Sequence, residues 1–234
     1  MDIKTYLDNT EFATKQLFCL LFELVENKNN LIHLEGMAPL HLKDAKTFES
    51  FASQVKADGN DEESRYFFKK AYEKYHVYKE ASSSIENIKN HYTDKISIAN
   101  GPIQVISQAI LQIAKQGLSF VYDTNIKNIE KKLTSPPRTI LDKNGDSIKK
   151  FDKGNLGTKD INIIDVIWQG RNQSIHYEEG KMFQNVTDLF EPLMNSYDKL
   201  TGYDNYQNKA YEIVSIVLEW DSYESYRKDM EKIV

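Results

Sequence analysis

The sequence has one cysteine, Cys19, among its 234 residues. A single thiol excludes an intrachain disulfide framework, and it excludes a metal site built from several cysteines. Cys19 lies within the apolar run LFCLLF at residues 17–22. We therefore expect its side chain to be buried as a small hydrophobic group.

The sequence also lacks a long hydrophobic run. No apolar stretch approaches the length of a membrane span, and the N-terminus lacks the basic region, apolar core and cleavage site of a secretory signal. Hydrophobic residues make up 40% of the chain and charged residues 28%, which is ordinary for a soluble globular protein. We expect a cytoplasmic protein without a membrane partner, long enough for one large domain or two small ones.

Strand-like alternation is rare, and apolar residues recur instead at the three- and four-residue spacing of helices. Gly36 and Pro39 interrupt this spacing, so we expect residues 27–42 to be irregular. Gly117 lies in the most hydrophobic of the predicted helices and would let a neighbouring segment approach closely. The segments in which we expect helices are residues 10–27, 43–56, 61–91, 102–132, 160–177, 185–200 and a last one from residue 205.

A short β-hairpin is the exception to this helical pattern. Residues 139–141 and 147–149 are strand-like, and they flank the turn sequence DKNGD at residues 142–146. An Asn-Gly pair between two such runs is typical of a hairpin turn. We expect a small, basic β-hairpin near residues 138–151, projecting from a helical body.

Positive charge is concentrated in one part of the chain. The net charge of −5 argues against a protein that coats nucleic acid non-specifically. Residues 127–159, however, hold nine basic and four acidic side chains, a local net charge of +5. Such a cluster can attract RNA, or it is only a solvated connector. The lysines that we assign to electrostatic RNA binding are Lys143, Lys149, Lys150 and Lys153.

Residues 160–177 contain neither Lys nor Glu, although a solvated helix face in this chain normally carries both. We expect a helix here, preceded by a turn at residues 154–159 and capped by Thr158. Ile164, Trp168 and Ile175 form its apolar stripe. The polar residues that share one flank, at steps of four, three and four, are Asp165, Gln169, Asn172 and His176.

Arg171 stands beside this polar flank. Residues five apart on an ideal helix point about 140° apart, so Arg171 and His176 do not share a face. The long arginine side chain can swing round, and Gly170 can loosen the turn, whereas Asn172 and His176 face each other naturally. These groups can bind a phosphate, move a proton and orient a hydroxyl. The alternative interpretation is that these residues form only the solvent-exposed face of an amphipathic helix.

At residues 171–176 the chain resembles a known family. The run RNQSIH matches the R-N-x-x-x-H signature of HEPN-domain ribonucleases, and it lies on a predicted helix in a helical chain. The resemblance covers residues 102–234. It implies an all-α, HEPN-like bundle of about six to seven helices at residues 101–234, with the hairpin as an insertion. Residues 1–100 resemble no family, and we expect them to form an N-terminal helical region packed on the bundle, with any linker near residues 93–101.

The resemblance implies a metal-independent endoribonuclease that needs no cofactor. The ribose 2′-hydroxyl would attack the adjacent phosphorus, leaving 2′,3′-cyclic phosphate and 5′-hydroxyl ends. His176 would transfer the proton of the attacking 2′-hydroxyl or of the leaving 5′-oxygen, and Arg171 would hold the phosphate. Asn172 would orient the phosphate or the imidazole of His176. Asp165 and Gln169 would support them. The family also implies a homodimer whose active site forms where two copies meet, a role in phage defence or as a toxin, and an antitoxin or regulatory partner.

One departure concerns the toxins of this superfamily that are paired with nucleotidyltransferases, which carry His-x-Tyr. Here Tyr177 follows His176 directly and Glu178 takes the next place, which argues against that subfamily. The alternative function is a catalytically silent HEPN-like module that binds a nucleotide or a partner protein. A helical scaffold protein with an incidental motif is a third interpretation.

Overall fold

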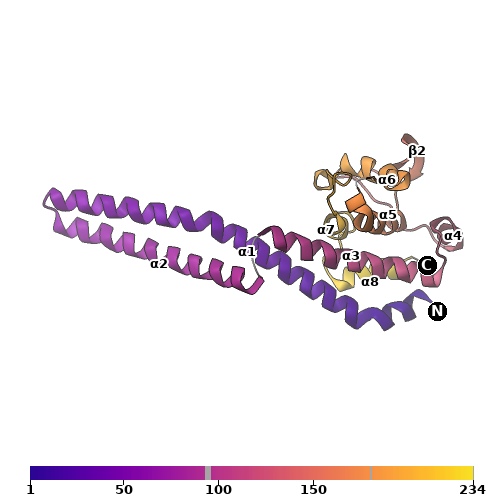
Figure 1. Cartoon of the computed structure of the whole chain (residues 1–234), viewed down its shortest axis with the longest axis horizontal. Coiled ribbons are helices and arrows are strands. Elements are labelled where there is room, and N and C mark those ends of the chain that lie inside the picture. The colour runs from indigo at the N-terminus through magenta and orange to yellow at the C-terminus, as the bar shows by residue number, and fades with distance from the viewer. Residues whose placement is uncertain (93–95, 180, 234) are drawn as a thin grey trace. The chain divides into compact units, whose positions relative to one another are not determined.

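The computed structural model describes residues 1–92, 96–179 and 181–233, and helices dominate it (Figure 1). The chain divides into two compact units. Unit 1 consists of Met1–Phe22 and Gly101–Val234, and unit 2 consists of Glu23–Asn100. The sequence-based division fell at residue 100 alone, whereas the compact units also divide the chain after Phe22. Residues 93–95 of the expected linker lie outside the described residues.

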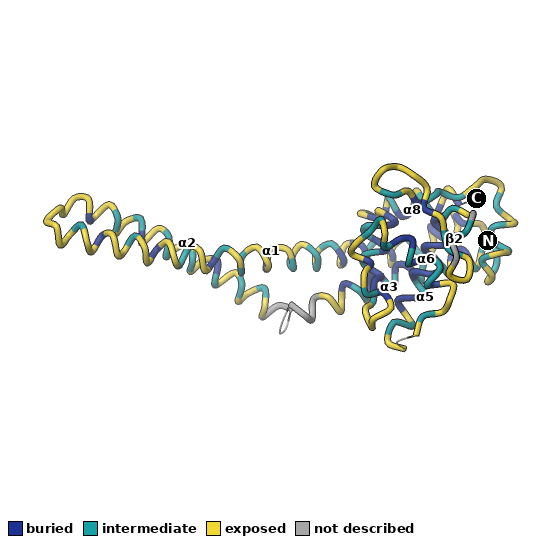
Figure 2. The backbone as a smooth tube through the Cα atoms, turned by 90° about the horizontal axis from the view of Figure 1, so that it is seen from above, coloured by how far each residue is buried: buried dark blue, intermediate teal, exposed yellow. Residues whose placement is uncertain are grey.

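Unit 2 is a helical hairpin. The later part of helix α1 (Ile3–Ala57) and helix α2 (Asp61–Tyr92) run side by side in both views (Figures 1 and 2). The chain reverses at Gly59, whose φ of +84° favours glycine. Asn60 then caps α2: its Oδ1 accepts a hydrogen bond from the Glu63 amide at 3.2 Å, and its Nδ2 donates to the Glu63 carboxylate at 2.8 Å.

Small residues form the seam between these two helices. The buried positions on α1 recur every seven residues, as in a coiled coil, and those on α2 are separated by one step of seven and one of ten residues. The Ser64 hydroxyl donates to the Ala52 carbonyl across the seam at 2.9 Å. Small side chains let the two backbones approach closely. The buried seam residues are Leu31, Ala38, Ala45 and Ala52 on α1, with Ser64, Ala71 and Ala81 on α2.

The prediction that residues 27–42 are irregular is wrong, because α1 runs through them without interruption. The predicted helices at residues 10–27 and 43–56 are therefore parts of one helix. Gly36 and Pro39 both lie on its exposed side, where a proline forfeits one backbone hydrogen bond without disturbing the seam. The packing of Leu31 and Ala38 against α2 outweighs that cost.

Unit 1 is built around helix α3 (Ile96–Val121), whose inward side chains between Ile103 and Leu118 are buried. The start of α1 lies against it, and the Tyr6 hydroxyl donates to the Ile113 carbonyl at 2.8 Å. A Cβ placed on Gly117 would lie 2.7 Å from the Tyr6 ring. The predicted close approach at Gly117 is therefore confirmed, and Tyr6 is the neighbour that requires it.

The predicted helix at residues 102–132 is two helices. α3 begins before Pro102 and ends at Val121, and α4 spans Ile126–Lys132. The side chains of Asp123 and Asn125 cause the break, since they accept hydrogen bonds from the Asn125 and Lys127 amides at 2.9 and 3.0 Å. Side-chain capping of this kind competes with helix continuation.

The hairpin lies further along the chain than predicted. Strands β1 (Lys149–Asp152) and β2 (Asn155–Asp160) pair antiparallel. Their turn is at Lys153 and Gly154, which have φ values of 51° and 83°, as a two-residue hairpin turn requires. The predicted turn at residues 142–146 also forms, because the Asp142 amide donates to the Asp146 carbonyl at 2.8 Å, but only isolated bridges flank it. Residues 154–159, predicted to be a turn, largely form β2.

Helix α5 (Ile163–His176) confirms the helix predicted at residues 160–177, although Asn162 caps it in place of Thr158. Ile163–Gly170 are all buried. Gly170 is needed where Ile213 crosses, because an added Cβ would lie 2.9 Å from the Ile213 Cγ2 atom. Gly180, which falls between α5 and the next long helix, lies outside the described residues. Figure 2 shows the dark blue of buried residues concentrated on α3, α5 and α6.

Short elements complete unit 1. The helix predicted at residues 185–200 ends early, two residues after Pro192, and the helix predicted from residue 205 is split by a π-helix and a bend. The elements are the 3-10 helix Tyr177–Glu179, α6 (Gln184–Met194), the 3-10 helix Asp198–Leu200, α7 (Ala210–Glu212), the π-helix Ile213–Val217 and α8 (Tyr223–Glu231).

Trp220 is the fully buried centre of the C-terminal core. Its ring meets the Tyr226 ring edge-on at 4.9 Å, and its Nε1 donates to Asp229 at 3.0 Å. The guanidinium of Arg138 donates to the same carboxylate at 2.8 Å. Burial raises the pKa of the Tyr226 hydroxyl well above its usual value. These contacts hold α8 to the segment that precedes the hairpin.

The predicted burial of Cys19 is wrong, because its thiol is exposed. Phe18 and Leu21 take the inward positions of that turn of α1. The fold is predominantly helical with one small antiparallel hairpin, as predicted. Eight α-helices occur in the described part of the chain, including the three-residue α7. None of the described helices combines the length and the apolar character needed to cross a bilayer.

Candidate functional site

The N-terminus of α5 is fixed by a capping box. Asn162 Oδ1 accepts hydrogen bonds from the amides of Ile164 and Asp165, both at 3.0 Å, and Asp165 Oδ2 accepts from the Asn162 amide at 3.3 Å. The other Asp165 oxygen binds the Lys150 ammonium at 2.8 Å. Asp165 thus anchors the hairpin to α5, and its described contacts go to Lys150 and Asn162 rather than to Arg171.

Three amide side chains form a network along the next turn of α5. Gln169 Oε1 accepts hydrogen bonds from Asn172 Nδ2 at 3.1 Å and from Asn185 Nδ2, on α6, at 3.0 Å. Gln169 is buried, and Asn172 is half-buried. The predicted supporting residue Gln169 therefore contacts the predicted site residue Asn172 directly, and it fixes which way the Asn172 oxygen points.

Two cations converge on that oxygen. Arg171 Nη1 and Lys115 Nζ, from α3, both donate to Asn172 Oδ1 at 3.3 Å. Arg171 Nε also donates to Gln112 Oε1 at 2.6 Å, and the Lys115 ammonium lies 4.4 Å from the centre of the Trp168 ring. We call Lys115 and Arg171 the cation pair.

The cation pair has an unusual electrostatic setting. Burial lowers the pKa of the Lys115 ammonium to about 8, and the neighbouring Arg171 charge adds to this shift. Burial also lowers the pKa of Arg171. Among the contacts of the described residues, neither cation forms an ion pair with Asp or Glu. Two half-buried cations held together by amides would gain from an anion that binds both.

His176 ends α5, and its side chain is 30% exposed. Its Nδ1 lies 2.5 Å from Glu179 Oε1, and its ring meets the Phe183 ring edge-on at 5.2 Å. When Nδ1 carries the proton shared with the carboxylate, Nε2 is left for proton transfer. The described contacts of His176 go to residues that follow α5, whereas those of Arg171 and Asn172 go to α3 and to Gln169. The structure thus joins Arg171 with Asn172, and it joins neither of them directly with His176.

Sequence reasoning missed four members of this site: Gln112, Lys115, Glu179 and Asn185. Gln112 and Lys115 were visible as polar residues three apart in the most apolar helix, which is the spacing of side chains that share a face. Glu179 was visible as a carboxylate three residues after His176. For Asn185 the sequence offered no signal, because the packing of α6 on α5 brings it to Gln169.

Two of the four lysines assigned to RNA binding are paired with carboxylates. Lys149 pairs with Asp160 at 2.8 Å, and Lys150 pairs with Asp165 at the same distance. Lys143 is exposed on the turn at residues 142–146, and Lys153 is exposed at the turn of the hairpin. The positive charge is spread over the hairpin, and part of it is neutralised locally.

No family model matches the chain, and comparisons with curated proteins and with solved structures gave no significant match. Within the part of the chain that the structure describes, no three His, Cys, Asp or Glu side chains gather as metal ligands would. The function must therefore be inferred from the side chains themselves.

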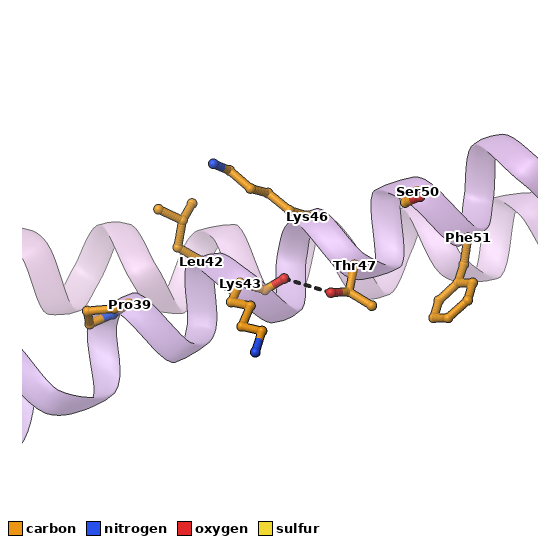
Figure 3. Close-up of a pocket in the computed structure, with 7 residues that line it drawn as sticks. All are labelled: Pro39, Leu42, Lys43, Lys46, Thr47, Ser50 and Phe51. Carbon is orange, nitrogen blue, oxygen red and sulfur yellow. Dashed lines mark hydrogen bonds between the residues drawn. The ribbon is translucent and has the colours of Figure 1, made fainter.

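A hollow on unit 2 does not compete with this site. It has a volume of about 540 Å³ and is lined by residues of α1 alone, from Pro39 to Phe51. Figure 3 shows these side chains spread along one helix, with the Thr47 hydroxyl bonded back to the Lys43 carbonyl of the same helix at 3.0 Å. A surface formed by a single helix offers a ligand no converging polar groups.

Proposed function

We propose that unit 1 is a HEPN-like domain and that the protein is a metal-independent endoribonuclease. The observation that carries the proposal is the cation pair, which is held on the oxygen of Asn172 without a carboxylate partner among the described residues. An RNA phosphate would supply the missing negative charge. The helical architecture around α5 and the RNQSIH run support the same family.

The chemistry follows from the roles of three side chains. The 2′-oxygen of the RNA attacks the adjacent phosphorus as the bond from phosphorus to the 5′-oxygen breaks. His176 Nε2 exchanges the proton of the 2′-hydroxyl or of the leaving 5′-oxygen, while Glu179 holds its ring. Arg171 and Lys115 stabilise the negative charge that develops on the phosphoryl oxygens. The products are a 2′,3′-cyclic phosphate and a 5′-hydroxyl.

The divergent contacts of Arg171 and His176 favour a site shared by two copies. Within one copy, Arg171 is tied to Gln112 of α3, whereas His176 is tied to Glu179. A two-fold dimer would bring the His176 of one copy to the Arg171 of the other, and two-fold dimers are the commonest oligomers. A role in phage defence or as a toxin, with a regulatory partner, follows from the family alone.

The test is digestion of a structured RNA in the presence of EDTA. We expect the wild-type protein to cut the RNA, and we expect Arg171→Ala and His176→Ala each to lower the rate at least about a hundredfold. Arg65→Ala and His33→Ala remove the same side chains from exposed positions of unit 2 and should leave the rate unchanged. RNA with a 2′-O-methyl group at the cleaved nucleotide should resist cleavage.

The two inactive variants also test the shared site when they are mixed in equal amounts. Random exchange makes half of the dimers mixed, and one of the two sites in each is intact, so about a quarter of the wild-type rate should return. No recovery would contradict a site made from Arg171 of one copy and His176 of the other. Cleavage that survives both substitutions would end the proposal, and RNA binding without cleavage by any version would favour the silent module.

A further inference from the structure

A pocket of about 420 Å³ lies within unit 1, and its lining includes Gln169, which accepts a hydrogen bond from Asn172. Helices α4, α5 and α6 and the hairpin all contribute side chains to it. Its volume falls in the range of small-molecule sites, and four separate elements close around it. The proposed chemistry makes no use of this pocket.

The α5 side of the pocket is polar and buried. Asp165 is 4% exposed and Gln169 is 6% exposed, and both line the cavity together with Asn185. The Gln169 oxygen accepts two amide hydrogen bonds, but across the described contacts its Nε2 group donates none. Because Gln169 lines the pocket, this amide group can donate a hydrogen bond to an acceptor atom of a ligand.

The pocket also has apolar walls. Phe151 is half-buried on the hairpin, and Leu189 and Ile126 reach the pocket from α6 and α4. An aromatic side chain beside buried hydrogen-bonding groups suits a flat ligand that has polar edges, because the ring can stack on its face.

The charges around the pocket favour a neutral ligand. Lys150 is paired with Asp165, and Lys159 is paired with Glu130. The carboxylate of Asp188 accepts hydrogen bonds from the backbone amides of Lys153 and Gly154 at 3.0 and 2.9 Å. The other two charged residues of the lining, Lys127 and Asp152, contribute one charge of each sign, so the walls favour neither a cation nor an anion.

We infer that this pocket binds one nucleobase of the RNA. The inference rests on the proposed ribonuclease function and extends it to a base-specific subsite. Gln169 connects the two regions, because it lines the pocket and also accepts a hydrogen bond from Asn172, whose oxygen holds the cation pair. A nucleotide carries a base and a phosphate on one ribose, so its base would enter the pocket while its phosphate meets Arg171 and Lys115.

The test is calorimetric titration of the full-length protein with the four nucleoside 5′-monophosphates. We expect one or two of them to bind at least about tenfold more tightly than ribose 5-phosphate or inorganic phosphate. Equal affinity for ribose 5-phosphate would overturn the inference, because the site would then recognise only the phosphate. Failure of all the nucleotides to bind would overturn it as well.

Two variants locate the base. Phe151→Leu keeps an apolar side chain and should weaken the preferred nucleotide about tenfold. Gln169→Glu keeps the two accepted hydrogen bonds and removes the Nε2 donor, so it should change which base binds best. Gln116→Glu makes the same change at an exposed position of α3 that does not line the pocket, and it should leave the preference unaltered. A preference unmoved by both pocket variants would place the base elsewhere and refute the inference.

Binding and cleavage can fail separately. His176 does not line the pocket, so His176→Ala should retain the base preference while losing cleavage. If the wild-type protein binds one base selectively but cuts no RNA, the base pocket stands and the nuclease proposal falls. If it cuts RNA without any base-dependent binding, the reverse holds.

Discussion

The two units differ in the size of the side chains that they bury. Unit 1 packs large side chains into a closed core, and its largest fully buried residues are Trp220, Tyr226 and Phe190. In its described part, unit 2 consists mainly of two paired helices, and its buried positions are mostly alanines, with one leucine and one serine. A hairpin of two helices can bury one narrow stripe on each, so its larger apolar side chains stay at the surface. Examples are Ile32, Leu40, Phe51, Tyr66 and Tyr72.

This contrast explains why the candidate site lies in unit 1. Polar side chains hold fixed positions only where packing from several directions limits their motion. Gln169 is buried on α5 and receives hydrogen bonds from two other side chains. On the unit 2 hairpin, most long polar side chains are exposed, and their ion pairs are of the surface kind that contributes little.

The largest expected difference between the units concerns a buried aromatic residue. Trp220→Ala should lower the free energy of unfolding of unit 1 by about 3–5 kcal/mol, because it leaves a cavity and removes one of the two hydrogen bonds that the Asp229 carboxylate accepts from Trp220 and Arg138. Phe51→Ala, at a position 48% exposed in unit 2, should cost about 1 kcal/mol. Urea unfolding followed by circular dichroism measures both. Equal losses would contradict the contrast between a packed core and a shallow seam.

A smaller effect should appear when the seam of unit 2 is overfilled. Ala45 is fully buried, and Ala45→Leu would force the two helices apart, at a cost of about 1–3 kcal/mol. Gln54→Leu adds a leucine to an exposed position of the same helix and should change stability by less than about 0.5 kcal/mol. Circular dichroism during urea unfolding compares the two variants. If Ala45→Leu lowers the free energy of unfolding no more than Gln54→Leu does, the two helices do not pack closely at the seam.

The smallest expected effect concerns the pH dependence of stability, because Lys115 is only partly buried and solvent weakens the influence of its surroundings on the ammonium group. The pKa of Lys115 is about 8 in the folded protein, below the usual lysine value of 10.5. The unfolded chain therefore holds this proton more tightly, so the Lys115 contribution to stability increases as the pH rises from about 8 towards 10.5. Lys115→Met should remove this increase.

Urea unfolding of the two proteins between pH 7 and pH 10 measures the difference. Tryptophan fluorescence reports on unit 1 because both tryptophans lie there. Lys143→Met, at an exposed turn position, is the control and should keep the wild-type pH dependence. Identical pH profiles for the wild type and Lys115→Met would show that Lys115 is not held in a partly buried site beside Arg171.

Predictions from the sequence were most accurate where the structure depends on the residues of one short segment. Helix α5 was found from its apolar stripe and its polar flank. The close approach at Gly117 was predicted because glycine has no side chain to keep a neighbouring segment away. The predominance of helices followed from spacing alone. For α5 and for the helical spacing, local preference and tertiary packing favour the same structure.

Predictions failed where packing opposed local preference. Gly36 and Pro39 suggested a break, but contacts with α2 keep α1 helical through both residues. The Asn-Gly turn suggested a hairpin at residues 138–151, yet the ladder forms at β1 and β2, where Lys153 and Gly154 supply the turn. The site showed the same limit, because the motif named Arg171 and Asn172 but could not name Lys115, which lies 57 positions before Asn172 in the chain.

The sequence by itself indicated a predominantly helical fold, and it placed an imidazole, a guanidinium and three other polar groups on a single helix. Only the tertiary structure decided their partners, since contacts between distant segments depend on how the helices pack. The packing of the helices brings Lys115 and Arg171 to the same oxygen of Asn172 and pairs Asp165 with Lys150. It also forms the pocket that Gln169 lines. Spacing along one helix fixes only the direction in which each side chain leaves the backbone. What it meets there is set by segments far away in the chain.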